Sequence, residues 1–103
     1  MDRAAAPSPY RSSPVFDQIS LPAALRREHR TKQGVWGVIR VLEGELLLTL
    51  VETGEVKLLT AGSPGIVLPD QPHLVEPLGA MRMQVDFYDR APDPRHLGGS
   101  LCG

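Results

Sequence analysis

The sequence has little cysteine. Cys102 is the single cysteine among 103 residues, so the chain forms neither an internal disulfide nor a cysteine-based zinc site. Long apolar runs are missing as well, since none approaches the roughly 20 residues that a helix needs to cross a bilayer. Residues 1–9 have no sustained apolar segment of the kind that marks a secretory signal. These absences predict a cytoplasmic protein without a membrane partner, with Cys102 as an incidental thiol.

A surplus of charge of either sign is also missing. The chain has 11 Lys and Arg against 12 Asp and Glu, a formal net charge of -1, so we expect no nucleic-acid partner. Basic residues do gather around His29. They are Arg26, Arg27, Arg30 and Lys32. These residues form either a solvated, mixed-charge face or a binding place for an anion.

The motifs of several enzyme classes are missing too. No Gly-x-Ser-x-Gly turn presents a nucleophile, and no glycine-rich loop opens a helix to cradle a phosphate. The sequence therefore identifies no catalytic and no cofactor-binding residue, and it leaves open whether the chain is an enzyme. A mononuclear metal site made of imidazole and carboxylate groups and an apolar pocket without metal both remain.

Short apolar runs separated by glycine and proline make up the middle of the chain. Residues 1–13 and 91–103 have the composition of flexible tails, which leaves 14–90 as one β domain. We expect a helical turn near 21–27 and a hairpin at Gly44, where a positive φ suits glycine. The spacing predicts a small antiparallel sandwich or barrel of six to eight strands. The expected strands are 15–19, 35–42, 46–51, 56–59, 65–68, 73–75 and 81–88.

His73 follows a segment that prolines make stiff. Pro69 and Pro72 each restrict their own φ and bias the preceding residue toward extended backbone. A side chain that leaves such a segment has a more definite position than one on a mobile loop. His73 is therefore the strongest candidate in the chain for a ligand or catalytic group.

Three ordered blocks carry a family resemblance. HRTKQGVWGVIRVLEG at 29–44, PDQPHLVEPLG at 69–79 and VDFY at 85–88 resemble the TehB/YeaR-like family, small cupin-fold domains associated by name with tellurite resistance. The resemblance runs from about residue 16 to 88. It implies an all-β, cupin-like sandwich or barrel.

The resemblance also implies where a metal would bind. His29 stands near the first-motif histidines of cupins, and His73 is the second-motif histidine. Thr31, Gly37 and Pro77 stand where a typical cupin has a second histidine, a glutamate and an asparagine.

Carboxylates of the last predicted hairpin are the candidate replacements. A turn at 77–80 would place Asp86 on the same face as His73, and His29, His73 and Asp86 would then bind Zn, Fe, Mn or Ni. Glu76 replaces Asp86 if the strand ends early. A shift of one residue instead turns Asp86 to the other face, where it pairs with an arginine such as Arg40.

The function that the resemblance implies is that of a small cupin-fold protein. It would bind a divalent metal, a small molecule or both in its barrel, with a link to tellurite or to oxidative or nitrosative stress. The alternative is a non-catalytic anion-binding or structural dimer module without metal. Expected partners are a second copy of the chain and a small molecule or oxyanion. TehB-type proteins owe their tellurite chemistry to a methyltransferase domain, which 103 residues are too few to contain, so we expect no methyl transfer by this chain alone.

Overall fold

The structure, a computed structural model, describes residues 8–93, which contain eight β-strands and one short 3-10 helix. The all-β prediction is confirmed, and the short helix falls within the segment predicted as a helical turn. In chain order the elements are β1 (Arg11–Ser12), β2 (Phe16–Asp17), η1 (Ala23–Arg26), β3 (Trp36–Glu43), β4 (Leu46–Leu50), β5 (Glu55–Leu59), β6 (Gly65–Val67), β7 (His73–Pro77) and β8 (Arg82–Tyr88).

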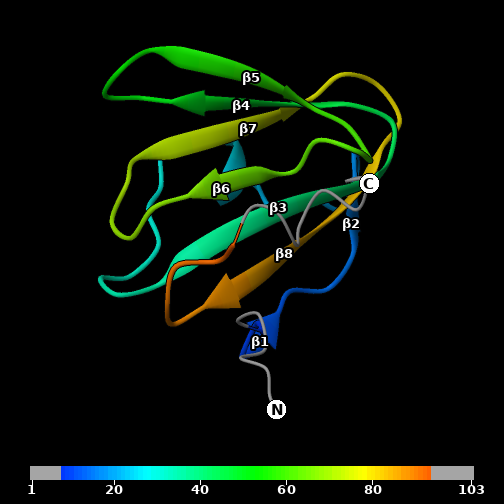
Figure 1. Cartoon of the computed structure of the whole chain (residues 1–103). Helices are drawn as coiled ribbons and strands as arrows, with labels where there is room; N and C mark the ends of the chain where they lie inside the picture. Colours follow the sequence, from blue (N-terminus) through cyan, green and yellow to red (C-terminus); the bar gives the residue numbers. More distant parts are fainter. Residues whose placement is uncertain (1–7, 94–103) are drawn as a thin grey trace.

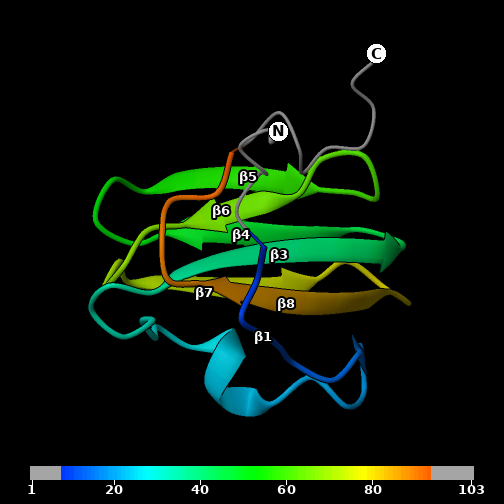
Figure 2. The same cartoon turned by 60° about the horizontal axis from the view of Figure 1, so that its bottom comes forward.

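The strands form two antiparallel sheets (Figure 1). The larger sheet has the order β1-β8-β3-β6, with β2 paired to a further part of β8, and the smaller sheet has the order β5-β4-β7. Figure 2 shows η1 beyond the end of the molecule where β7 and β8 lie, and η1 contacts β7. The predicted sandwich is therefore confirmed.

The core lies between the two sheets. Successive strand residues point to opposite faces, so Leu46, Leu48 and Leu50 of β4 are buried while the residues between them are only partly buried. Side chains of the larger sheet pack against them. Besides these leucines, the main members of the core are Ile39, Val41, Val67 and Met83 of the larger sheet and Leu59 and Val75 of the smaller sheet.

Two connections differ from the prediction. Gly44 does adopt a positive φ of 76°, but it joins β3 to β4 across the sandwich rather than in a hairpin. The predicted hairpin at 77–80 is wrong in the same way, because β7 pairs with β4 whereas β8 pairs with β3. The reason is burial: β3 and β4 each carry apolar side chains that must face another sheet, and crossing over gives each of them one. Gly54 does lie in a hairpin, between β4 and β5.

The ends of the described range add three findings. The predicted N-terminal tail includes β1, which pairs with β8, so the folded part starts before residue 14. Residues 1–7 and 94–103, which include Cys102, lie outside the described range. Within that range no helix has the length and apolar character needed to cross a membrane.

Gly44 supplies a test of the crossover. A Cβ at Gly44 would press against the carbonyl oxygen of Ala80 and lie 2.9 Å from Cα of Met81, whereas a Cβ at Gly54, with a similar φ of 74°, meets no atom within 4 Å. We expect Gly44→Ala to lower the free energy of unfolding by about 1–3 kcal/mol more than Gly54→Ala, because only the first substitution adds a steric clash to the backbone strain. Urea unfolding followed by circular dichroism measures both losses. Equal losses would show that the turn does not approach Ala80.

Candidate functional site

A cavity of about 340 Å³ lies between the two sheets. Its walls are mostly apolar side chains from both sheets, among them Ile39, Val67, Val75, Met83 and Phe87. The segment between η1 and β3 supplies polar groups, and His73 at the start of β7 supplies another. A volume of this size falls at the small end of pockets that bind organic molecules.

His29 and His73 meet at this cavity. The backbone N–H of each donates a hydrogen bond to the backbone carbonyl of the other, both 2.9 Å long, in an isolated antiparallel bridge. The imidazole ring centroids are 4.0 Å apart, and the ring planes are inclined by 57°. His73 faces inward because it shares a face of β7 with buried Val75.

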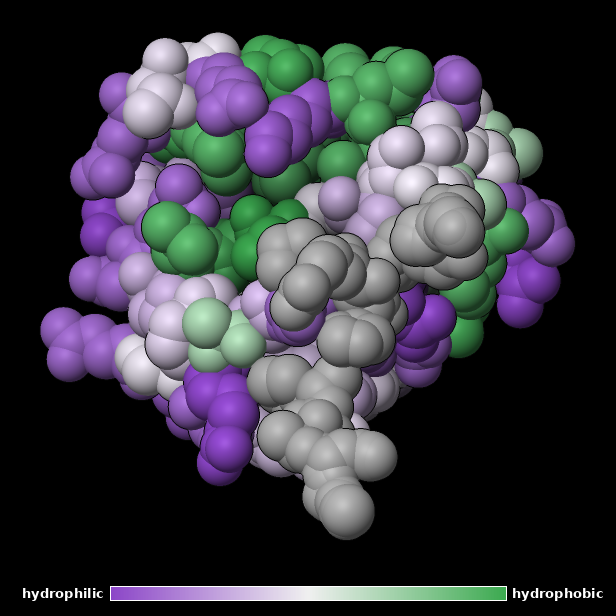
Figure 3. Space-filling view, in the orientation of Figure 1, coloured by the Kyte–Doolittle hydropathy of each residue, from purple (hydrophilic) through white to green (hydrophobic). Residues whose placement is uncertain are grey.

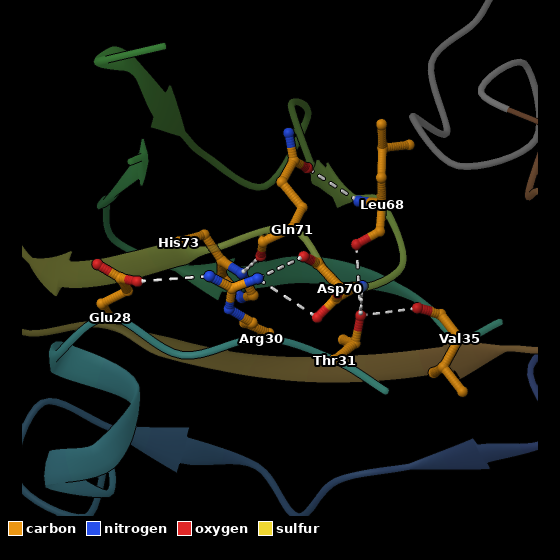
Figure 4. A network of polar contacts seen from close by, with 8 residues as sticks. All are labelled: Glu28, Arg30, Thr31, Val35, Leu68, Asp70, Gln71 and His73. Atoms are coloured by element: carbon orange, nitrogen blue, oxygen red, sulfur yellow. Dashed lines mark hydrogen bonds and ion pairs between the residues drawn. The ribbon is translucent and has the colours of Figure 1, made fainter. Parts of the chain in front are cut away.

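The proline-framed turn ahead of His73 is held by Thr31 and Arg30 (Figure 4). Asp70 has a φ of 57°, a left-handed conformation that a non-glycine residue needs support to keep. The Thr31 hydroxyl accepts a hydrogen bond from the Asp70 N–H at 3.3 Å and donates to the Val35 carbonyl at 2.7 Å. Arg30 reaches the Asp70 carboxylate at 3.5 Å. These contacts fix the backbone from which His73 leaves.

Both imidazoles are held by their Nδ1 atoms. Nδ1 of His73 lies 2.8 Å from the Gln71 carbonyl oxygen, and Nδ1 of His29 lies 2.9 Å from that of Arg27. A carbonyl oxygen only accepts, so Nδ1 of each ring carries a proton, and Nε2 of a neutral ring is a hydrogen-bond acceptor. Within residues 8–93, neither Nε2 atom has a hydrogen-bond partner.

The environment keeps His73 neutral. Burial lowers the pKa of His73 from its ordinary value of 6.5; the hydrogen bond to Gln71 opposes this shift, and the nearby His29 adds to it. His73 is therefore an uncharged acceptor at neutral pH.

Cations surround the cavity without a facing carboxylate. Arg11, Arg30 and Lys32 belong to its lining, and no Asp or Glu among the described residues does. Arg30 is already paired with Asp70 and, at 3.9 Å, with Glu28 (Figure 4). The charge near the cavity is thus positive but partly compensated.

Asp86 does not join the histidines. It lies on the opposite face of β8 from the cavity-lining side chains, and Nε of Arg40 approaches its Oδ2 at 2.6 Å while the Ser12 hydroxyl donates to its Oδ1 at 2.7 Å. This contact raises the pKa of Arg40. The prediction that Asp86 shares a face with His73 is wrong, because it assumed that β8 pairs with β7. β8 instead pairs with β3, where Asp86 lies opposite Val38. The alternative pairing of Asp86 with Arg40 is the one that the structure shows.

Glu76 does not join them either. It alternates with His73 and Val75 along β7, so its side chain is exposed on the outer face of the smaller sheet, opposite Leu47. Among the described residues no three His, Cys, Asp or Glu side chains gather where they could hold a metal ion. The proposed set of His29, His73, Asp86 and Glu76 is thus reduced to two facing imidazoles.

Two further residues shape the site and were not predicted to do so. Thr31 fixes the turn, although the sequence showed it only as a missing histidine. Gly37 lines the cavity, and a Cβ there would come no closer than 3.5 Å to Thr31 and 3.8 Å to Val85, so its lack of a side chain leaves room. The position of Gly37 within a β-branched run was the available signal, since a glycine inside a strand often marks a close approach.

A family model described as the TehB-like domain matches residues 11–85. The probable S-adenosyl-L-methionine-dependent methyltransferase TehB of Haemophilus influenzae strain 10810 is 31% identical over 90 residues, which cover 82% of this chain and 32% of the relative. The protein of the same name from strain KW20 / Rd is 40% identical over 48 residues, 46% of this chain and 17% of the relative. The chain thus spans about a third or less of the length of these curated relatives.

Two solved structures resemble the fold. The crystal structure of TehB from Haemophilus influenzae superposes with a TM-score of 0.71 at 31% identity, over 81% of this chain and 31% of that chain. A protein from Escherichia coli K12 reaches a TM-score of 0.73 at 21% identity, over 90% of this chain and 99% of that one. At that identity the second likeness shows the fold alone.

The relatives correct the predicted function. The resemblance was taken to imply a metal-binding cupin, or else a metal-free anion-binding or structural module. The curated relatives are instead named as methyltransferases. The metal-binding function is therefore wrong.

The lowered pKa of His73 has a consequence for stability. Because the pKa in the folded chain lies below the ordinary value of 6.5, unfolded His73 takes up a proton at a higher pH than folded His73 does. The free energy of unfolding should keep this contribution above pH 6.5 and lose it as the pH falls through the folded pKa, with a slope of up to about 1.4 kcal/mol per pH unit. We expect His73→Gln to remove that slope. Chemical unfolding measured from pH 8 to pH 5 tests this.

The matched control is His96→Gln, which changes a histidine in the segment predicted from the sequence as a tail. It should keep the wild-type slope below pH 6.5. A His73→Gln protein with the same slope as the wild type would show that His73 is not held neutral by burial.

Proposed function

Since the chain belongs to the TehB-like domain family, we propose that it is an accessory domain of a methyltransferase. In this proposal it assists a catalytic domain that transfers the methyl group of S-adenosyl-L-methionine. The catalytic domain lies outside the residues that the chain shares with its relatives. The tellurite association of the family enters through that catalytic domain, with tellurite as a methyl acceptor.

The extent of the match carries the proposal. The match covers 82% of this chain but only 32% of a protein named as a probable methyltransferase. About two thirds of that relative therefore lies beyond the shared domain. A division of labour between a β domain and a separate catalytic part fits this proportion.

The cavity supports an accessory role rather than a cofactor site. S-adenosyl-L-methionine carries a positively charged sulfonium and a ribose whose hydroxyls are commonly bound by an acidic side chain. Arg11, Arg30 and Lys32 line the cavity, and no carboxylate of the described residues does. Like charges would repel the sulfonium, and the ribose would lack an acceptor of the usual kind.

A chimera tests the proposal. In Haemophilus influenzae TehB, this chain would replace the matching segment, and methyl transfer from labelled S-adenosyl-L-methionine to tellurite would be measured. We expect the chimera to keep activity within about tenfold of TehB, a loss of no more than about 1.4 kcal/mol in transition-state stabilisation. The same chimera with Gly44→Ala should lose activity on mild warming before the Gly54→Ala control does.

Calorimetry on the chain alone completes the test. We expect no heat of binding with S-adenosyl-L-methionine. Tight binding of that cofactor by the chain alone, or methyl transfer without TehB, would contradict an accessory role. An inactive, folded chimera would contradict it as well.

A second copy of the chain and a cytoplasmic location also belong to the proposal. β5 pairs only with β4 among the described strands, so its other edge presents free N–H and C=O groups. Val56 and Leu58 on this strand are 55% and 48% exposed, and Figure 3 shows apolar surface along the upper edge, where Figure 1 places β5. The low cysteine content fits a reducing compartment.

Light scattering after size exclusion tests the second copy. We expect the wild type to elute as a dimer and a Val56→Asp/Leu58→Asp variant as a monomer, because the added charges cannot be buried at an interface. Leu78→Asp, at a position of similar exposure (44%), is the control and should stay dimeric. A wild type that is monomeric at high concentration would make the dimer prediction wrong.

A further inference from the structure

Nε2 of His73 is a buried acceptor that no group of residues 8–93 satisfies. His73 lines the cavity and is only 4% exposed, and its Nδ1 donates a hydrogen bond to the Gln71 carbonyl oxygen. None of the described residues donates to Nε2. Buried polar atoms almost always have a hydrogen-bond partner, so one from outside residues 8–93 is expected here.

Water alone is a poor partner in this cavity. A water molecule needs two to four polar partners to be well held, and each occupies about 30 Å³ of liquid. A cavity of about 340 Å³ with walls such as Val67, Val75 and Phe87 would expose most of its waters to apolar surface. A molecule with an apolar body displaces such waters favourably.

Glycine and the two sheets give the cavity its room. Gly37 of β3 shares the inward face with Ile39, and both line the cavity. Any side chain at Gly37 would enter this space, since a Cβ there already contacts Val67 at 3.9 Å.

A neutral donor suits the acceptor at His73 better than an ion does. A cation would meet Arg11, Arg30 and Lys32 in the lining. At Nε2 of neutral His73 an anion would place its oxygen lone pairs against the nitrogen lone pair, and Arg30 of the lining is already engaged by Asp70. A neutral molecule with its own O–H or N–H group avoids both conflicts.

We propose that this cavity binds a small, neutral, mostly apolar organic molecule that donates an O–H or N–H hydrogen bond to Nε2 of His73. Nε2 of His29, whose ring centroid lies 4.0 Å from that of His73, is a second acceptor for the same group or a neighbouring one. The inference goes beyond the accessory role and does not depend on it, since binding is measured on the chain alone.

Three naphthalene probes of similar size test the proposal at neutral pH. 2-Naphthol donates an O–H hydrogen bond, 2-methoxynaphthalene has the same body without the donor, and 2-naphthoate is an anion. We expect 2-naphthol to bind at least about tenfold more tightly than the methyl ether, because the ether leaves the buried acceptor unsatisfied. We expect 2-naphthoate to bind more weakly than 2-naphthol. Fluorescence titration measures all three.

Three variants assign the binding to the site. His73→Leu should lower the affinity for 2-naphthol about tenfold and leave that for the ether unchanged, since it removes the acceptor and keeps the bulk. Gly37→Val should weaken the binding of both, because its side chain would take up part of the cavity. Glu76→Gln, on the outer face of the same strand as His73, is the control and should behave as the wild type.

Several outcomes overturn the proposal. They are equal binding of 2-naphthol and its ether by the wild type, no binding of either, and tighter binding of 2-naphthoate than of 2-naphthol. Unchanged binding in Gly37→Val would also overturn it, and this variant decides the matter if His73→Leu does not fold.

Discussion

The pair of reciprocal backbone hydrogen bonds between His29 and His73 is the constraint on which the site depends. They attach the segment between η1 and β3 to the free edge of β7, at the point where the smaller sheet would otherwise end. The attachment brings two imidazoles into contact and closes one side of the cavity. The Nδ1 hydrogen bonds to backbone carbonyls then set the orientation of both rings. The chemistry of the site thus follows from main-chain geometry, with the turn held by Thr31 as its support.

Much of the fold could be predicted from the sequence, because its signals are local. Short apolar runs separated by glycine and proline marked most of the strands, and Gly44 and Gly54 stand where positive φ values occur. The proline frame pointed to His73, and the family resemblance added His29. The position of Asp86 could not be read from the same signals. A turn such as 77–80 does not reveal whether the next strand pairs with the preceding one or crosses to the facing sheet, and that choice decides the face on which Asp86 lies.

The length shared with the relatives and the lining of the cavity both bear on what this domain contributes to a larger protein. The relatives are named as methyltransferases, yet the shared part is about a third or less of their length. The cavity of this chain is lined by cationic side chains, which are poor partners for a sulfonium. The family name therefore describes the larger protein in which such a domain occurs, while the chemistry of this domain has to be derived from its own side chains.

The place of β8 in the larger sheet has a consequence for how the chain folds during synthesis. β8 is the last strand within residues 8–93, yet it lies between β3 and the first strands β1 and β2, so the sheet joins segments from opposite ends of the described range. Such non-local pairing is slow, because long loops must close before the contacts that reward them can form. A nascent chain that stops short of β8 leaves one edge of β3 unpaired and both N-terminal strands without a partner. The domain therefore becomes able to fold only when nearly all of it has left the ribosome, and any following domain emerges while this one is still closing.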